Sequence, residues 1–270
     1  MGKIAYTPHN TDMSAATLAV AVLLLAPSLE AQDPLTLAPS YSIASIANAA
    51  TNLPAGFAPN SIVSIYGTNL SYNTASASAA TVLPTTVGGV LVYFGLIKAS
   101  VFYVSPGQID VLIPYSLGPG NASLLVIRDG TAGPTVTLPL TTTAPGLFQS
   151  APNTVLATHA DNSLITASAP ATAGEVIIIY ATGLGYTNPD QTDGEIPTHP
   201  AQITNLSSLS VLINGVSTGP GSIQYAGVTP GCAGLYQINL QLPSPLPSNP
   251  EIRVQIGTQI SPAGMNLPTH

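Results

Sequence analysis

Three six-residue segments of this chain alternate apolar and polar side chains with a period of two: Gln108–Ile113, Gln237–Leu242 and Glu251–Ile256. Because successive side chains of a β-strand point to opposite faces of the sheet, the alternation predicts strands with one buried face. More short apolar segments lie between clusters of Gly, Pro, Asn and Ser: Ile62–Tyr66, Val90–Phe94, Val101–Val104, Ser123–Ile127, Thr135–Leu140, Val176–Ala181, Leu209–Ile213 and Ser222–Tyr225. This spacing of strands and turns predicts antiparallel β-sandwiches.

Helical patterns are weak in the same region. No segment after residue 31 repeats its apolar residues with a period of 3.6, and 26 prolines in 270 residues disfavour long helices. Ser40–Ala50 has the composition for one short helical turn at most. We therefore expect an all-β fold.

An internal repeat organises the chain. The segment Ser61–Leu70 (SIVSIYGTNL) resembles Glu175–Leu184 (EVIIIYATGL), and each reads as a strand running into a turn and then a leucine. A second pair, Pro106–Pro114 and Tyr236–Pro243, shares an alternating strand that begins at a glutamine. The first pair is offset by 114 residues and the second by 129, which is the size of a domain and not of a solenoid repeat.

The repeat predicts two tandem immunoglobulin-like sandwiches. A sandwich takes about 100 residues, and the chain after residue 31 is long enough for two. The segment Thr141–Gly146 is small, polar and interrupted by proline, as linkers are. We place the first domain at residues 32–143 and the second at residues 144–270.

The amino terminus resembles a secretory signal peptide. A basic residue, Lys3, precedes the apolar run Ala15–Ala26, which is shorter than the roughly 20 residues that a membrane span needs. The best cleavage position is after Ala31, so residues 1–31 are the predicted signal peptide; a buried helix is the alternative. No later segment is long and apolar enough for a transmembrane span. We expect a protein that is secreted or held in the cell envelope, in the periplasm or on the outer surface.

The charge excludes one class of partner. The chain has 4 Lys and Arg against 11 Asp and Glu, a formal net charge of −7. Nucleic-acid binding depends on clustered basic side chains, so no nucleic-acid partner is expected.

Several motifs together resemble a protein family. Ala58–Asn60 followed by the SIVSIYGTNL run looks like the opening of an IPT/TIG domain, which is an immunoglobulin-like sandwich. The further segments are Leu83–Val90, Tyr103–Asp110, Ala144–Phe148, Tyr180–Gly185, Asp193–Gly194, Tyr225–Gly227 and Gly234–Asn239. Together they are similar to an uncharacterised secreted domain family of acidobacteria, often found at the C-terminal end of larger surface proteins. The resemblance implies two immunoglobulin-like halves outside the cytoplasm, and it carries over no catalytic residue and no cofactor.

Residues with catalytic potential are few. Gly215–Gly219 matches the G-x-S-x-G pattern around Ser217, but a second predicted strand follows where a nucleophile elbow needs a helix. The glycines therefore predict a hairpin. His159 and Asp161 could form a pair in which the carboxylate orients the imidazole for base catalysis. No credible nucleophile or metal partner accompanies them, so we interpret them as a solvated turn. His159 and His199 lack a third metal ligand at a diagnostic spacing.

Three further features allow binding functions. Asp190, Asp193 and Glu195 could offer oxygens to calcium, although Asp, Gly and Pro also simply make turns, and the turn is our preferred interpretation. Tyr72, Tyr115 and Tyr186 fall in predicted loops, where tyrosines can contact a sugar or a protein. The single cysteine, Cys232, excludes an internal disulfide, and we expect it to be a buried, inert thiol.

The sequence as a whole predicts an exported, non-catalytic interaction module. It would bind an extracellular or envelope protein, or a second copy of itself, through loops and sheet edges. A polysaccharide-binding module is the first alternative, and a secreted hydrolase with a site between the two domains is the second. We predict no catalytic, cofactor or metal residues and no cofactor.

Overall fold

The computed structural model describes residues 37–78 and 81–270. The described chain is all-β, and its helices are three-residue 3₁₀ turns: η1 (Ile43–Ser45), η2 (Leu206–Ser208) and η3 (Pro220–Ser222). In the described ranges, no helix is long and apolar enough to cross a bilayer. The predicted signal peptide lies outside the described residues.

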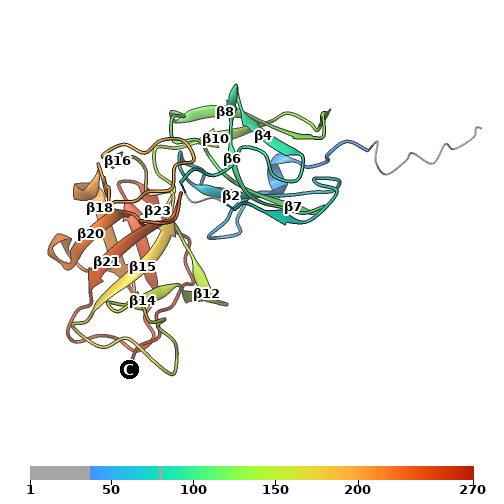
Figure 1. The fold of residues 1–270 in the computed structure, drawn as a ribbon. Helices are drawn as coiled ribbons and strands as arrows, with labels where there is room; N and C mark the ends of the chain where they lie inside the picture. The colour runs from blue at the N-terminus through green and yellow to red at the C-terminus, as the bar shows by residue number, and fades with distance from the viewer. Residues whose placement is uncertain (1–36, 79–80) are drawn as a thin grey trace, which may run out of the picture. The chain divides into compact units, whose positions relative to one another are not determined.

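The first sandwich consists of two antiparallel sheets (Figure 1). One has the strand order β1-β2-β7-β6-β3. Its bounds are β1 (Ile46–Asn48), β2 (Ile62–Tyr66), β3 (Ala75–Ser76), β6 (Ser100–Val104) and β7 (Gln108–Leu112). The other has the order β10-β8-β4-β5, with β9 also paired to β8. Its bounds are β4 (Val90–Phe94), β5 (Ile97–Lys98), β8 (Gly120–Arg128), β9 (Thr131–Ala132) and β10 (Val136–Leu140).

The second sandwich repeats this plan. Its larger sheet has the order β11-β15-β21-β20-β17-β16, with β14 also paired to β15. The bounds are β11 (Gly146–Leu147), β14 (Ala157–His159), β15 (Val176–Thr182), β16 (Thr187–Asn188), β17 (Gln202–Ile203), β20 (Ile223–Val228) and β21 (Tyr236–Gln241). The facing sheet, β19-β18-β22-β23, comprises β18 (Leu209–Ile213), β19 (Val216–Ser217), β22 (Ile252–Ile256) and β23 (Gln259–Ile260). A separate hairpin joins β12 (Gln149–Ala151) to β13 (Thr154–Val155).

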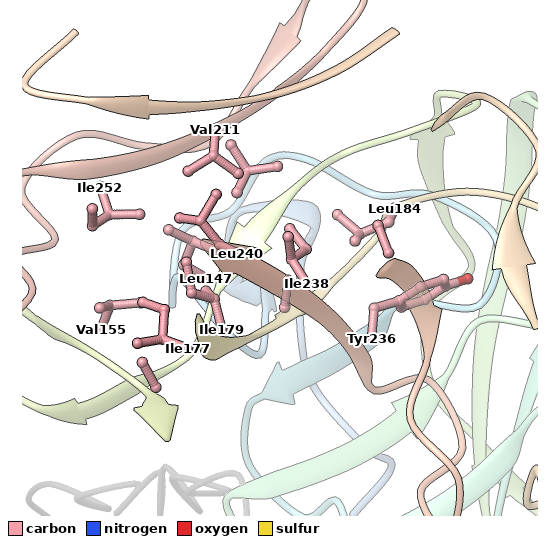
Figure 2. Close-up of a cluster of buried hydrophobic side chains, with 14 of the residues drawn as sticks. Leu147, Val155, Ile177, Ile179, Leu184, Val211, Tyr236, Ile238, Leu240 and Ile252 are labelled. Atoms are coloured by element: carbon pink, nitrogen blue, oxygen red, sulfur yellow. The ribbon is translucent and has the colours of Figure 1, made fainter. Parts of the chain in front are cut away.

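Each sandwich encloses its own apolar core. In the second, side chains from β15 and β21 meet side chains from β18 and β22, and Figure 2 shows Ile177, Ile238, Val211 and Ile252 among them. The first core is built in the same way from β2, β7, β4 and β8. The alternating segments found in the sequence supply these inward faces, which is why their period is two.

The sequence repeat is also a repeat of strand register. Tyr66 pairs with Gln108 across β2 and β7, and Tyr180 pairs with Gln237 across β15 and β21. These pairs of strands lie side by side in Figure 1. The turns that follow β2 and β15 correspond as well, because Asn69 and Gly183 both have positive φ, of 57° and 76°. The all-β prediction and the antiparallel sandwiches are therefore confirmed.

All the strand segments predicted from sequence overlap strands of the structure. The segment Ser40–Ala50 differs in part, because only Ile43–Ser45 forms a 3₁₀ turn and Ile46–Asn48 continues as β1. Strands of two or three residues, such as β9, β14 and β23, were not predicted. Such strands are too short to show a period, and they form because a neighbouring strand supplies the hydrogen bonds.

Buried polar contacts join the two sandwiches. The Asn60 amide donates to the Tyr236 hydroxyl at 3.1 Å, and that hydroxyl donates to the carbonyl oxygen of Gly185 at 2.6 Å. The backbone N–H of Ile62 donates to the Thr182 hydroxyl at 3.1 Å. Burial raises the pKa of Tyr236, so its hydroxyl stays neutral and keeps both bonds.

A small apolar cluster extends this junction. Leu83 and Leu112 from the first sandwich meet Ala233 from the second. Gly234 lies so close to the first sandwich that a β-carbon there would stand 2.4 Å from a methyl group of Leu112. This glycine belongs to a segment that carried the family resemblance, and its role is close packing.

Candidate binding groove

Three adjoining hollows make a groove beside the β23 edge. Their volumes are about 490, 210 and 260 Å³. The exposed side chain of Gln259 borders all three. The walls come from three segments: Leu53–Phe57, Pro139–Pro145 and Ile256–Pro262. The second of these begins within β10 and continues beyond its end.

No charged side chain borders the groove in the described part of the chain. Its lining is threonine, serine, proline, alanine, glycine, amides, aliphatic residues and one phenylalanine, Phe57. Three exposed large apolar side chains stand at its rim: Ile43, Leu53 and Ile260, at 41, 46 and 40 % exposure. Because an unpaired charge buried against such a surface is costly, the groove favours an uncharged ligand.

The polar groups of the groove are available to a ligand. Within residues 37–78 and 81–270, the side-chain amide of Gln259 makes no hydrogen bond. The side-chain oxygen of Asn205, which borders the largest hollow, is buried without a partner among the described residues. A buried acceptor without a partner costs free energy that a ligand donor can recover.

The backbone of β23 is also open on one side. Gln259 pairs with Ile256, and Ser261 donates its N–H to the carbonyl oxygen of Val254 at 2.8 Å. In an antiparallel ladder, the residue between two such hydrogen-bonded pairs turns its N–H and C=O away from the partner strand. Ile260 is that residue, and β23 is the last strand of its sheet. The groove therefore contains one unpaired backbone donor and one unpaired acceptor.

Two of the loop tyrosines are not exposed binding residues, so this sequence expectation is wrong. Tyr115 is 6 % exposed and meets Tyr186 edge-to-face, with ring centres 5.2 Å apart. The Tyr186 hydroxyl donates to the carbonyl oxygen of Leu117. Sequence placed both residues in loops, but these loops pack between the two sandwiches. Tyr72 lies beneath Arg128, whose guanidinium carbon is 4.0 Å from the ring centre.

The acidic loop is tied to the first sandwich. Asp190 accepts the Tyr115 hydroxyl at 2.9 Å, and Asp193 accepts the backbone N–H and the hydroxyl of Ser116 at 2.9 and 2.6 Å. Glu195 forms an isolated bridge with Val82. In the part of the chain that the structure describes, no three His, Cys, Asp or Glu side chains gather as a metal site. These bonds favour the structural interpretation of the loop over calcium binding.

His159 has a carboxylate partner, but it is not Asp161. Its Nδ1 bonds to Glu175 and its Nε2 lies 3.2 Å from the carbonyl oxygen of Ala169. Asp161 instead accepts the backbone N–H and hydroxyl of Ser163, as a turn residue does. The hydrogen bond to Glu175 raises the pKa of His159. The 16-residue separation concealed this pair, because only the packing of β14 against the 169–175 loop brings it together.

The remaining candidates take ordinary structural positions. Ser217 lies in β19 after a two-residue turn with positive φ at Asn214 and Gly215, which confirms the hairpin interpretation. Its hydroxyl bonds to that of Ser210 at 2.6 Å. His199 bonds to the hydroxyl of Thr198.

The expectation of a buried cysteine is wrong. Cys232 is exposed, because the loop turns at Gly231, where φ is 90°, and Ala233 takes the buried place beside Leu112.

No sequence pattern predicted the groove. Its residues are small or neutral and lie in turns, where no spacing or charge pattern marks them. The exposure of the apolar side chains at its rim could not be predicted either, because exposure depends on the packing of distant segments.

Comparisons with known proteins add little to this description. No protein-family model matches the chain, and no curated protein matches it. A surface glycan-binding protein from a xyloglucan utilization locus of Bacteroides uniformis matches 86 % of the chain with 10 % identity, a TM-score of 0.28 and 50 % coverage of its own length. A surface glycan-binding protein of Prevotella bryantii matches 86 % with 14 % identity, a TM-score of 0.27 and 42 % coverage of its length. Tandem immunoglobulin repeats of Dlar match 87 % with 13 % identity, a TM-score of 0.22 and 96 % coverage.

The chain spans half or less of the length of the two glycan-binding structures. At these TM-scores the likenesses carry no conclusion about function. The resemblance to the secreted acidobacterial family stays a prediction.

Proposed function

We propose that this protein is an exported, non-catalytic module that binds a partner protein in the groove beside β23. The observation that carries the proposal is the set of unpaired polar groups in an uncharged groove: the Gln259 amide, the Asn205 oxygen and the backbone of Ile260. An amide side chain and a strand edge both bond to peptide backbone. Export is supported by the basic and apolar pattern of the first 31 residues.

The absence of catalysis is part of the proposal. The hydroxyl of Ser217 bonds to Ser210 and to the N–H of Gly219, and the described residues place no histidine beside it. His159 is held by Glu175 and Ala169, and no nucleophile among the described residues bonds to it. Neither residue has the neighbours that nucleophilic catalysis requires.

Photo-cross-linking in the producing cells tests the proposed function. A photoreactive residue at position 259 lies in the groove, and the same residue at Gln224, exposed on β20, is the matched control. We expect position 259, and not position 224, to give a reproducible cross-link to one envelope or extracellular protein. Equal labelling from both positions, or no protein adduct from position 259, would refute the proposal.

A second candidate, polysaccharide binding, is favoured by a different hollow. Tyr66 is 36 % exposed and borders a hollow of about 440 Å³ together with the hydroxyl residues Ser40, Ser42, Ser45 and Thr68. An exposed aromatic ring among hydroxyls suits a sugar. Tyr66→Ala should then abolish retention on an insoluble neutral glucan, and unchanged retention, or none in either protein, would exclude this site.

A further inference from the structure

The two sandwiches have corresponding edges at β9 and β23. In the first, Gly133 donates its N–H to the carbonyl oxygen of Val126 at 2.9 Å, and in the second, Ser261 donates to Val254 at 2.8 Å. The preceding hairpins also correspond, since Arg128 pairs with Thr131 and Ile256 pairs with Gln259. Ala132 and Ile260 are therefore equivalent positions on the two edges.

The segment Pro39–Tyr41 packs beside the first edge at Gly133, whereas Ala132 itself is exposed. A β-carbon added to Gly133 would lie 2.8 Å from the Tyr41 ring and 2.9 Å from the carbonyl oxygen of Pro39. The Tyr41 hydroxyl accepts the backbone N–H of Val126 at 2.8 Å and donates to the carbonyl oxygen of Pro134. An uncharged segment that contains proline and an aromatic ring thus lies beside this edge.

The second edge keeps the proline of this segment, because Pro145 is equivalent to Pro39, but among the described residues it lacks the tyrosine ring. Ser40 bridges Thr68 and Gly146 bridges Thr182, so the equivalent of Tyr41 is Leu147, which lies in the core at 1 % exposure. The hydroxyl of Ser261 accepts the N–H of Val254 at 2.9 Å, which is the bond that the Tyr41 hydroxyl makes to Val126 in the first sandwich. A hollow of about 210 Å³ remains between Pro145, Ile260 and Pro262.

We propose that an extended, uncharged segment of a partner protein adds as a strand to β23, with the N–H and C=O of Ile260 as its backbone partners. The inference rests on the proposed function and names the binding mode and the chemistry of the partner. One apolar or aromatic side chain of the segment fills the 210 Å³ hollow, and the Gln259 amide bonds to its backbone.

Three observations identify the occupant as such a segment. The lining carries no charge in the described residues, so a charged segment would lose its hydration without a counter-ion. Strand addition needs an unpaired backbone edge, which Ile260 provides. In the first sandwich, an uncharged proline-containing segment packs beside the equivalent edge at Gly133.

Selection of random seven-residue peptides displayed on phage, with the purified protein as the target, tests the proposal. The variant Ile260→Lys places a charge on the edge. Val216→Lys is the matched control, because Val216 is a 70 % exposed apolar residue in β19, at the other end of the same sheet. Unfolding midpoints equal to the wild type establish that both variants are folded.

We expect the enriched peptides to be uncharged at their centre. Their affinity should fall about tenfold or more in Ile260→Lys and change less than about twofold in Val216→Lys. Failure to enrich any uncharged peptide, or equal binding by both variants, would overturn strand addition.

A third variant, Thr142→Lys, charges the opposite wall of the groove. Peptides lost in Thr142→Lys but not in Ile260→Lys would overturn strand addition and leave the groove as the binding site. Peptides that tolerate both variants would overturn the groove as well. Binding of maltohexaose that is lost in Thr142→Lys, with no peptide enriched, would assign the groove to glycans and refute both proposals.

Discussion

The Tyr41 hydroxyl accepts the backbone N–H of Val126 at 2.8 Å, beside one edge of the first sandwich. At the corresponding place in the second sandwich, the Ser261 hydroxyl accepts the N–H of Val254. The two halves thus satisfy the same backbone donor with different side chains. The exchange of a large ring for a small hydroxyl residue accompanies the hollow beside β23.

Tyr41→Phe should destabilise the fold, because it removes the acceptor from the N–H of Val126. A buried donor without a partner costs about 1–3 kcal/mol. Urea unfolding measures the loss, and Tyr66→Phe is the control, since its hydroxyl bonds to Asn52 at the surface and should change stability by less than about 0.5 kcal/mol. Equal effects of the two substitutions would show that the edge does not depend on Tyr41.

Arg128→Met should also destabilise the first sandwich. The Arg128 side chain is buried, and it donates to the carbonyl oxygens of Asn69 and Leu37 at 2.7 and 2.6 Å. Hydrogen bonds from a charged donor are worth about 1.5–3 kcal/mol each, so we expect a loss of about 2 kcal/mol or more.

Arg253→Met is the control for Arg128→Met. Arg253 is half-buried and donates only to the carbonyl oxygen of Ser261. Chemical denaturation should show a smaller loss for this variant. A greater loss in Arg253→Met than in Arg128→Met would contradict the assignment of Arg128 as an anchor.

The His159–Glu175 pair predicts a dependence of stability on pH. The hydrogen bond to Glu175 raises the pKa of His159 above 6.5. The contribution of His159 to the stability of the fold is therefore complete below pH 6.5, and it is lost as the pH rises through the pKa of the folded state. Burial raises the pKa of Glu175, but bonds from His159 and Thr172 outweigh it and lower the pKa below 4.5. That contribution is complete above pH 4.5 and is lost as the pH falls.

The pair should therefore stabilise the fold most between about pH 4.5 and 6.5. Since both side chains are partly exposed, the effect should stay below about 1 kcal/mol. Thermal unfolding across pH 4–8 should show it in the wild type and not in Glu175→Gln. The same profile in both proteins would exclude the pair as its source.

Gly234→Ala tests the packing between the sandwiches. The new β-carbon would lie 2.4 Å from a methyl group of Leu112, and φ is +71°. Gly174→Ala is the control, because φ there is nearly the same, +77°, and an added β-carbon would have no atom within 4 Å. This variant therefore measures the cost of the backbone conformation alone, about 1–2 kcal/mol. We expect Gly234→Ala to cost at least about 1 kcal/mol more in urea unfolding. Equal costs would mean that the junction is loose.

The strands and their repeat could be predicted from sequence because alternation and β-branched residues report the buried face directly. The shared register of Tyr66 with Gln108 and of Tyr180 with Gln237 follows from the same repeat. The surroundings of Tyr115 could not be predicted, because its partner Asp190 lies 75 residues away. The groove could not be predicted for the same reason. Gln259 borders a groove only because two segments distant in the sequence form the other walls.

Hydrogen exchange at the Ile260 amide tests the central claim most directly. In the free protein this N–H points away from β22, and we expect it to exchange rapidly, whereas the N–H of Ser261, bonded to Val254, exchanges slowly. A selected uncharged peptide at saturation should slow exchange at Ile260 by about tenfold or more and leave Val216 unchanged. An Ile260 amide that exchanges at the same rate with and without bound peptide would contradict strand addition at this edge.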